Sequence, residues 1–244
     1  MTNPKAAILI IGDEILSGRT LDINTQEIAL RLGEVGVIVL ETRIIPDDKT
    51  TIINTIRQLH SKYDYIFTTG GIGPTHDDIT ADSVAAAFNK KLIVNQDIHN
   101  KLAEHYASLG ETLNPAREKM AYFPEDAVLL QTNATTAPGF MLNNVFVMAG
   151  VPRIMQSMLK SAIPLLKTGA IIKTKSIDVM IGESKVAKDF ATLQHKYTDI
   201  KMGSYPFVKG KLHGTSLVLR SSNYQNLETA FNELQDLINK RQNS

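Results

Sequence analysis

The sequence feature that most constrains the fold is a glycine-rich turn between a short apolar strand and a helix. The segment from Tyr65 to Thr80 reads YIFTTGGIGPTHDDIT. Its opening residues, YIFTT, are aromatic or β-branched, which is typical of a buried strand. Residues 83–88 (SVAAAF) favour a helix. A strand, a tight turn and a helix in this order predict one unit of an α/β domain.

The turn itself has the chemistry of a phosphate site. Gly70, Gly71 and Gly73 can adopt positive φ and allow a ligand to approach the main chain. The main-chain amides and the following helix N-terminus attract anions. Asp77 and Asp78 would repel a phosphate or pyrophosphate unless a divalent cation lies between them. We therefore predict Asp77 and Asp78 as catalytic residues and metal ligands, with Mg, Mn or Co as the divalent metal.

A structural explanation competes with this one. Glycine is common in any tight strand-to-helix turn, and Asp78 lies where a helix N-cap is expected. Either feature alone is explained better by structure. Together they are not, because one cap requires one carboxylate and one turn rarely requires three glycines.

The strand-and-helix pattern also occurs upstream of the turn. Apolar runs at residues 6–11 and 37–40 predict two more strands, and helices are expected after Asn24 and after Asp48. Strands that alternate with helices of this length predict a parallel sheet with right-handed crossovers. Ligands of such sheets bind outside the carboxyl ends of the strands.

Two acid-bearing loops are expected at that edge of the sheet, so they should converge on one cleft. The loop Gly12-Asp13-Glu14 follows the first strand directly, and Asp13 is a third candidate metal ligand. Asn24 has two interpretations, as the N-cap of its helix or as a ligand contact. The Pro-Asp-Asp sequence at residues 46–48 precedes a helix, so we interpret both of its acids as capping residues.

The rest of the chain completes two predicted domains, residues 1–168 and 170–244. In the first, residues 140–142 and 145–148 are expected to form a hairpin around Asn143-Asn144, a type I′ turn. In the second, a turn is expected at residues 203–206 (GSYP). The remaining predicted elements are helices at 96–109, 152–166, 183–197 and 224–240, and strands at 127–130, 176–181, 200–204 and 214–219.

Composition excludes several classes of function. Twenty-six basic against 25 acidic residues give a net charge of +1, without the excess of Lys and Arg that nucleic-acid binding requires. The absence of cysteine excludes disulfides, thiolate catalysis and Cys-type zinc sites. The apolar run at residues 6–11 is too short for a membrane span or a signal segment. We therefore expect a cytoplasmic protein with no nucleic-acid or membrane partner.

Several segments form an ordered set: Gly12–Gly18 (GDEILSG), Asp22–Asn24 (DIN), Pro46–Asp48 (PDD), Thr69–Asp78 (TGGIGPTHDD) and Ala137–Gly139 (APG). This set resembles the motifs of the molybdopterin-binding, MoaB/Mog-like domain, in particular the competence/damage-inducible protein A type. It covers about the first 165 residues. The GSYP segment and the strand after it resemble the end of the same domain at the N-terminus of eukaryotic FAD synthases.

The resemblance implies a three-layer α/β sandwich with a mostly parallel sheet, to which a small C-terminal α+β unit is added. It implies metal-dependent hydrolysis of dinucleotide pyrophosphates such as ADP-ribose or FAD, and it points to homo-oligomers. Together with the chemistry of the turn, it gives these candidate ligand-binding residues: Gly12, Asp13, Glu14, Asn24, Thr69, Gly70, Gly71, Gly73, Pro74, Thr75, Pro138 and Gly139.

Two alternatives remain open. One is binding of molybdopterin or a related pterin without cleavage, which is favoured by Ile154, because longer relatives often carry Glu there. Thr135 and Ala149 also depart from the Gly and Pro of many relatives. The other is that the C-terminal unit is an interaction module for nucleic acid or protein, although the near-neutral charge disfavours nucleic acid.

Overall fold

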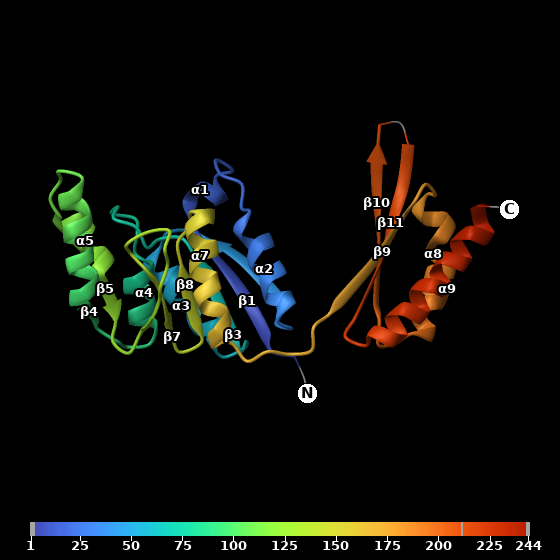
Figure 1. The fold of residues 1–244 in the computed structure, drawn as a ribbon, viewed down its shortest axis with the longest axis horizontal. Helices are drawn as coiled ribbons and strands as arrows, with labels where there is room; N and C mark the ends of the chain where they lie inside the picture. Colours follow the sequence, from blue (N-terminus) through green and yellow to red (C-terminus); the bar gives the residue numbers. More distant parts are fainter. Residues whose placement is uncertain (1–2, 211, 243–244) are drawn as a thin grey trace. The chain divides into compact units, whose positions relative to one another are not determined.

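The computed structural model describes residues 3–210 and 212–242 (Figure 1). The chain divides between Gly169 and Ala170 into two compact units. The N-terminal unit carries the glycine turn and the acidic loops, so it holds the candidate site.

A six-stranded sheet forms the centre of the N-terminal unit, in the order β2-β1-β3-β8-β7-β6. Strands β2, β1, β3 and β8 are parallel, whereas β7 and β6 continue the sheet in antiparallel pairing. Their bounds are β1 Lys5–Ile11, β2 Ile38–Ile45, β3 Tyr65–Thr69, β6 Val128–Leu130, β7 Gly139–Leu142 and β8 Val145–Met148. The predicted mostly parallel sheet is confirmed.

Helices cover both faces of this sheet, and β1 shows why. Ala7, Leu9 and Ile11 belong to a core that includes buried residues of α3 (Lys49–His60) and α4 (Thr80–Ala87). The alternate residues of β1 belong to a second core with α2 (Asn24–Glu34) and α7 (Pro152–Ala162). A strand buried on both faces must be apolar throughout, which explains the unbroken apolar run. The predicted three-layer sandwich is confirmed.

The remaining elements of this unit are short or peripheral. A two-stranded antiparallel sheet joins β4 to β5. The bounds are α1 Asp13–Leu16, β4 Leu92–Val94, α5 Gln96–Ser108, α6 Pro115–Glu118, β5 Tyr122–Pro124 and two 3₁₀ helices, η1 Lys119–Ala121 and η2 Ile163–Leu165.

The turn between β7 and β8 differs from the prediction. A type I′ turn requires positive φ at both central residues, but only Asn143 has one, at 53°. The neighbouring residue is held by contacts outside the hairpin. The side chain of Asn144 donates to the Tyr63 carbonyl at 2.8 Å, and its own carbonyl accepts from the Ile66 amide at 2.8 Å. These hydrogen bonds to residues outside the hairpin explain why Asn144 does not adopt the conformation that the local sequence predicts.

The C-terminal unit is a three-stranded antiparallel sheet packed against two helices, which confirms the predicted small α+β unit. The sheet order is β10-β11-β9. Leu217 and Leu219 of the central strand lie in the core with Leu227 and Leu234 of the last helix. The bounds are β9 Lys173–Val179, α8 Glu183–Lys196, β10 Lys201–Lys209, β11 Leu212–Ser221 and α9 Tyr224–Gln242.

The predicted turn at residues 203–206 is wrong. These residues lie inside β10, where Tyr205 pairs with Ser216 and Pro206 pairs with Thr215. Proline is tolerated there because β10 is an edge strand and has a neighbour on one side alone. The glycine and proline therefore occur within an edge strand here.

In the part of the chain that the structure describes, none of the helices combines the length and apolar character needed to span a membrane.

Candidate functional site

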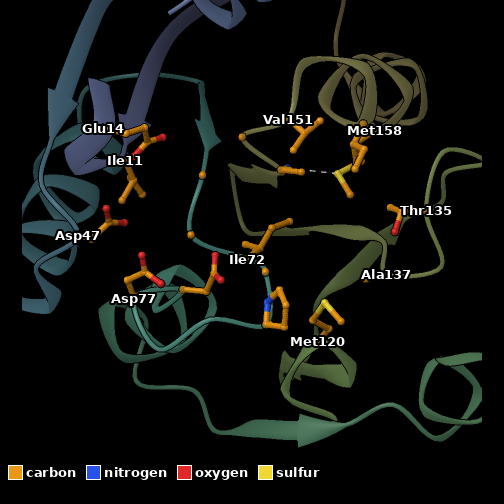
Figure 2. A pocket seen from close by; sticks show the side chains of 18 residues that line it. Ile11, Glu14, Asp47, Ile72, Asp77, Met120, Thr135, Ala137, Val151 and Met158 are labelled. Carbon is orange, nitrogen blue, oxygen red and sulfur yellow. Dashed lines mark hydrogen bonds between the residues drawn. The ribbon is translucent and has the colours of Figure 1, made fainter. Parts of the chain in front are cut away.

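A cavity of about 510 Å³ opens at the carboxyl ends of β1, β3 and β8 (Figure 2). It lies where parallel strands expose their ends, as expected for an α/β sheet. Its lining comes from the end of β1, from the segments that follow β1, β2, β3 and β8, from η1, from the loop before β7 and from helix α7. The lining residues are Ile11, Glu14, Asp47, Gly70, Gly71, Ile72, Gly73, Pro74, Asp77, Asp78, Met120, Thr135, Ala137, Ala149, Gly150, Val151, Ile154 and Met158.

The glycine turn brings main chain directly to the cavity. Gly70 has φ +102° and Gly71 has φ +68°. A Cβ atom on Gly70 would overlap the Ile11 carbonyl oxygen, so no larger residue fits there. Within the described residues, the amides of Gly71, Ile72 and Gly73 donate to no protein group. Unpaired amides in a glycine turn are available to an anionic ligand.

Carboxylates gather at one end of the cavity. Figure 2 shows Glu14, Asp47 and Asp77 on the same side, although Glu14 lies in α1, Asp47 in the loop after β2 and Asp77 in the turn after β3. The predicted convergence of the loops after β1 and β3 is therefore observed. Burial raises the pKa of Asp47, and the nearby charges of Asp13, Glu14 and Asp77 add to the rise. A hydrogen bond from the Thr75 hydroxyl lowers the pKa of Asp77.

The loop that carries Asp77 and Asp78 is organised by Thr75. The Thr75 amide donates to Oδ2 of Asp78 at 2.8 Å, and the single hydroxyl proton of Thr75 is shared between Asp77 and Oδ2 of Asp78, which lies 2.6 Å from the hydroxyl oxygen. Lys119 adds a bond from Nζ to the Asp78 carbonyl at 3.3 Å. Asp78 does not cap α4, because that helix begins at Thr80, its N-cap is Ile79, and no side chain caps it. The structural explanation of Asp78 as an N-cap is thus wrong.

Asn24 does not cap its helix either. Helix α2 begins at Asn24 itself, and Oδ1 of Asp22 accepts from the amides of Asn24 and Thr25 at 2.9 and 3.2 Å. Because Asp22 does the capping, the side chain of Asn24 is free to reach across the sheet edge. Its Nδ2 donates to the Gly150 carbonyl at 2.7 Å.

Asp47 is the residue that sequence reasoning misassigned. Only Asp48 caps α3, through a bond from the Thr51 amide to Oδ1 at 2.8 Å. The carboxylate of Asp47 instead accepts from the Asp13 amide at 3.0 Å and lines the cavity. The signal was present in the sequence, since one helix needs one capping carboxylate and two were available.

The predicted ligand-binding residues fall into two groups. Glu14, Gly70, Gly71, Gly73 and Pro74 line the cavity, together with the predicted catalytic pair Asp77 and Asp78. Gly12, Asp13, Asn24, Thr69, Thr75, Pro138 and Gly139 do not line it.

Each residue of the second group has another position. The side chain of Asp13 is exposed, while its amide contacts Asp47. Asn24 and Thr69 border a smaller hollow of about 60 Å³ beside the cavity. Gly139 is buried in β7, where a Cβ atom would overlap the Val147 carbonyl oxygen, so packing between strands explains it. Gly12 and Pro138 are also buried.

The apolar end of the cavity was missed by sequence reasoning. It is formed by Ile72, Met120, Thr135, Ala137 and Met158 (Figure 2). These residues come from the turn after β3, the 3₁₀ helix η1, the loop before β7 and helix α7. No spacing in the sequence connects them, so only the fold brings them together.

Comparison with known proteins agrees with this architecture. Residues 7–168 match the family described as "Probable molybdopterin binding domain". This chain belongs to that family. Residues 172–243 match the family described as "FAD synthase, middle domain". The two matches cover the two units of this molybdopterin-binding-domain protein separately, and they confirm the resemblance expected from the motifs.

A relative and a solved structure that carry the name CinA are similar to part of this chain. A CinA-like protein of Syntrophotalea carbinolica is 39% identical over 161 residues, which are 64% of this chain and 39% of that protein. A Pyrococcus furiosus protein is 34% identical over 222 residues, covering 86% of this chain and 88% of its own length. The crystal structure of CinA from Thermoplasma acidophilum matches with a TM-score of 0.62 and 29% identity, over 67% of this chain and 98% of that one.

Among residues 3–210 and 212–242, no group of three or more His, Asp or Glu side chains is arranged to hold a metal ion. A divalent cation would therefore need ligands from the substrate as well as from the carboxylates of the cavity.

Proposed function

We propose that this protein binds a dinucleotide pyrophosphate, such as ADP-ribose or FAD, and hydrolyses it with the help of a divalent metal, Mg, Mn or Co. One observation carries the proposal. Unpaired amides at residues 71–73 and the carboxylates of Glu14, Asp47, Asp77 and Asp78 line the same cavity. An anion site that faces acids suits a phosphate ligand accompanied by a cation.

A second source of positive potential supports an anionic ligand. Helix α7 begins at the cavity, where Val151 is its N-cap and Pro152 its first residue. Its first turn contains no acidic residue, and no side chain caps it. Such a helix N-terminus attracts a phosphate group through its dipole.

The carboxylates also suit a divalent metal. All are hard oxygen donors, and Mg is usually held in proteins by one or two carboxylates together with substrate phosphates. One or two of the carboxylates of Glu14, Asp47, Asp77 and Asp78 would hold it jointly with the pyrophosphate. When bound, the metal supplies Lewis-acid polarisation of a phosphoryl oxygen and lowers the pKa of a water molecule.

The protein's own groups have separate roles in this proposal. The Thr75 hydroxyl bonds to the Asp77 carboxylate and so positions it, and this bond also lowers the pKa of Asp77. The amides of Gly71, Ile72 and Gly73 stabilise negative charge that develops on phosphate oxygens. The ammonium group of Lys119 donates to the carbonyls of Thr75 and Asp78, and these bonds order the Asp77 loop.

A second candidate function is binding of molybdopterin or a related pterin without turnover. Ile154 favours it, because this side chain lines the cavity and offers no group for proton transfer. The apolar end of the cavity also suits a ring system.

With either function, we expect the protein to act in the cytoplasm as a homo-oligomer. Light scattering after size-exclusion chromatography tests the oligomeric state.

Product analysis separates the two functions. The purified protein is incubated with ADP-ribose or FAD, with Mg, Mn and Co supplied in turn, and AMP is quantified by chromatography. Metal-dependent AMP formation supports hydrolysis. If no metal gives AMP while a pterin or dinucleotide raises the melting temperature, the protein binds without cleaving.

A further inference from the structure

The cavity has two chemically different ends. Figure 2 shows the carboxylates of Glu14, Asp47 and Asp77 on one side. The other side is formed by Ile72, Met120, Thr135, Ala137 and Met158, which we call the ring slot. The ring slot has no ionisable side chain, so it cannot pair with phosphate or metal. Its walls are methyl, methylene and thioether groups, with one hydroxyl.

Met158 forms a fixed wall of the ring slot. Its side chain is 1% exposed, and its sulfur accepts a contact from the Ala149 amide at 3.4 Å. It packs so closely over β7 that a Cβ atom on Gly139 would lie 3.1 Å from the sulfur. A proline at position 149 would have no amide hydrogen for this contact. Ala149 is therefore part of what orients Met158.

Thr135 supplies the single hydroxyl of the ring slot. In the described part of the chain, this hydroxyl pairs with no protein group. The loop that carries it is nevertheless ordered, because the Thr132 hydroxyl donates to Ser157 of α7 at 2.7 Å and accepts from the Ala134 amide at 3.0 Å. A positioned hydroxyl without a partner can select a ligand by one hydrogen bond.

We propose that the ring slot binds the planar heteroaromatic ring of the ligand, with Met120 contacting the ring, Met158 closing the slot behind it and Thr135 bonding to the edge of the ring. Thioether sulfur makes favourable contacts with aromatic rings, and the uncharged walls match a ring better than a sugar or a phosphate. The inference rests on the proposed function in one respect, that the ligand's pyrophosphate occupies the acidic end. It makes Thr135 and Ala149 determinants of ring selectivity in this protein.

Ring-only probes test the ring slot without metal or turnover. Riboflavin, adenosine and 6-carboxypterin lack phosphate, and isothermal titration calorimetry measures the binding of each. We expect at least one to bind with Kd below about 1 mM. The ring that binds most tightly identifies the source as flavin, purine or pterin.

Two variants locate the binding. Thr135→Val keeps the shape of the side chain but removes the hydroxyl. It should raise the Kd of the ring that binds by about 3- to 10-fold. Met120→Ala removes one wall of the ring slot and should raise the Kd of that ring by about 10-fold. Thr112→Val, at an exposed threonine that does not line the cavity, is the matched control and should leave Kd unchanged. Melting temperatures confirm that each variant is folded.

Absence of binding for all three probes, or equal affinity in folded wild type and ring-slot variants, would overturn the inference. That result is distinct from failure of the proposed function, because metal-dependent AMP formation is scored in a separate assay. AMP formation without ring binding rejects the ring slot alone. Ring binding without AMP formation rejects hydrolysis alone.

Discussion

The side-chain amide of Asn24 donates to the carbonyl of Gly150, 126 positions further along the chain, at 2.7 Å. This bond joins the start of α2 to the turn that precedes α7. Gly150 lies in turn against Gly70, since a Cβ atom on Gly150 would be 3.5 Å from the Gly70 Cα atom. The bond thus fixes the position of one wall of the cavity from outside the cavity.

Replacing Asn24 by Ala should destabilise the protein by about 1 kcal/mol, because the Gly150 carbonyl loses its donor in a part-buried hydrogen bond. Urea unfolding at neutral pH measures the loss. Asn100→Ala, in the exposed part of α5, serves as the comparison and should change stability by less than about 0.5 kcal/mol. A loss at Asn24 no larger than at Asn100 would show that the bond contributes nothing.

Gly70 should not tolerate alanine. Its φ of +102° is unfavourable for any side chain, and the new methyl group would overlap the Ile11 carbonyl oxygen. We expect Gly70→Ala to cost about 3 kcal/mol or more. Gly18→Ala separates the two causes, because Gly18 has φ +72° with no atom within 4 Å of the added Cβ, and should cost only about 1 kcal/mol. Equal losses would mean that overlap with Ile11 is unimportant.

The ionised carboxylate of Asp47 should lower the free energy of unfolding at neutral pH, so we expect Asp47→Asn to raise that free energy. Burial and neighbouring carboxylates raise its pKa above the ordinary value of 3.8. A carboxyl group with a raised folded-state pKa disfavours folding at pH above that pKa, and the effect disappears below 3.8, where both states are protonated. We expect a gain in the free energy of unfolding at pH 7 that vanishes in acid. A loss of stability at pH 7 would contradict the assignment.

Glu41 should behave in the opposite way. Its carboxylate accepts from Arg43 at 2.6 Å and from Lys62 at 2.8 Å, and hydrogen bonds from Lys62, Tyr63 and Arg43 lower its pKa from 4.5 to about 2. The carboxylate therefore stabilises the fold above pH 4.5, and the contribution is lost as pH falls toward 2. Glu41→Gln should cost about 1 to 2 kcal/mol at pH 7. Urea unfolding across this range should show the difference shrinking in acid; a constant difference would contradict the prediction.

The sheet of the N-terminal unit could be predicted because the sequences of its central strands are compatible with few structures. The unbroken apolar run of β1 requires burial on both faces, and β3 ends in a glycine turn that admits few conformations. Strand β2 was predicted too short, at residues 37–40 in place of 38–45. It lies at the edge of the sheet, where Leu40, Thr42 and Ile44 are exposed, and the paired charges of Glu41 and Arg43 interrupt the apolar pattern.

The candidate site could be predicted only in part. Glu14 and Asp77 follow adjacent parallel strands, so topology alone brings them to one edge. Asp47 was misassigned because local capping rules explain it equally well. Met120, Thr135 and Met158 belong to segments with no shared periodicity, and their proximity depends on how the middle of the chain folds back over the sheet.

The most direct test of the central claim is metal-dependent AMP formation from ADP-ribose by wild type and by Asp77→Asn/Asp78→Asn. The matched control is Asp97→Asn/Glu104→Gln, which removes two carboxylates from the exposed surface of α5, away from the cavity. We expect wild type and control to release AMP at rates within about twofold of each other, and the cavity variant to lose about 100-fold or more. Full activity in the cavity variant would contradict the account, as would the absence of AMP from wild type with Mg, Mn and Co.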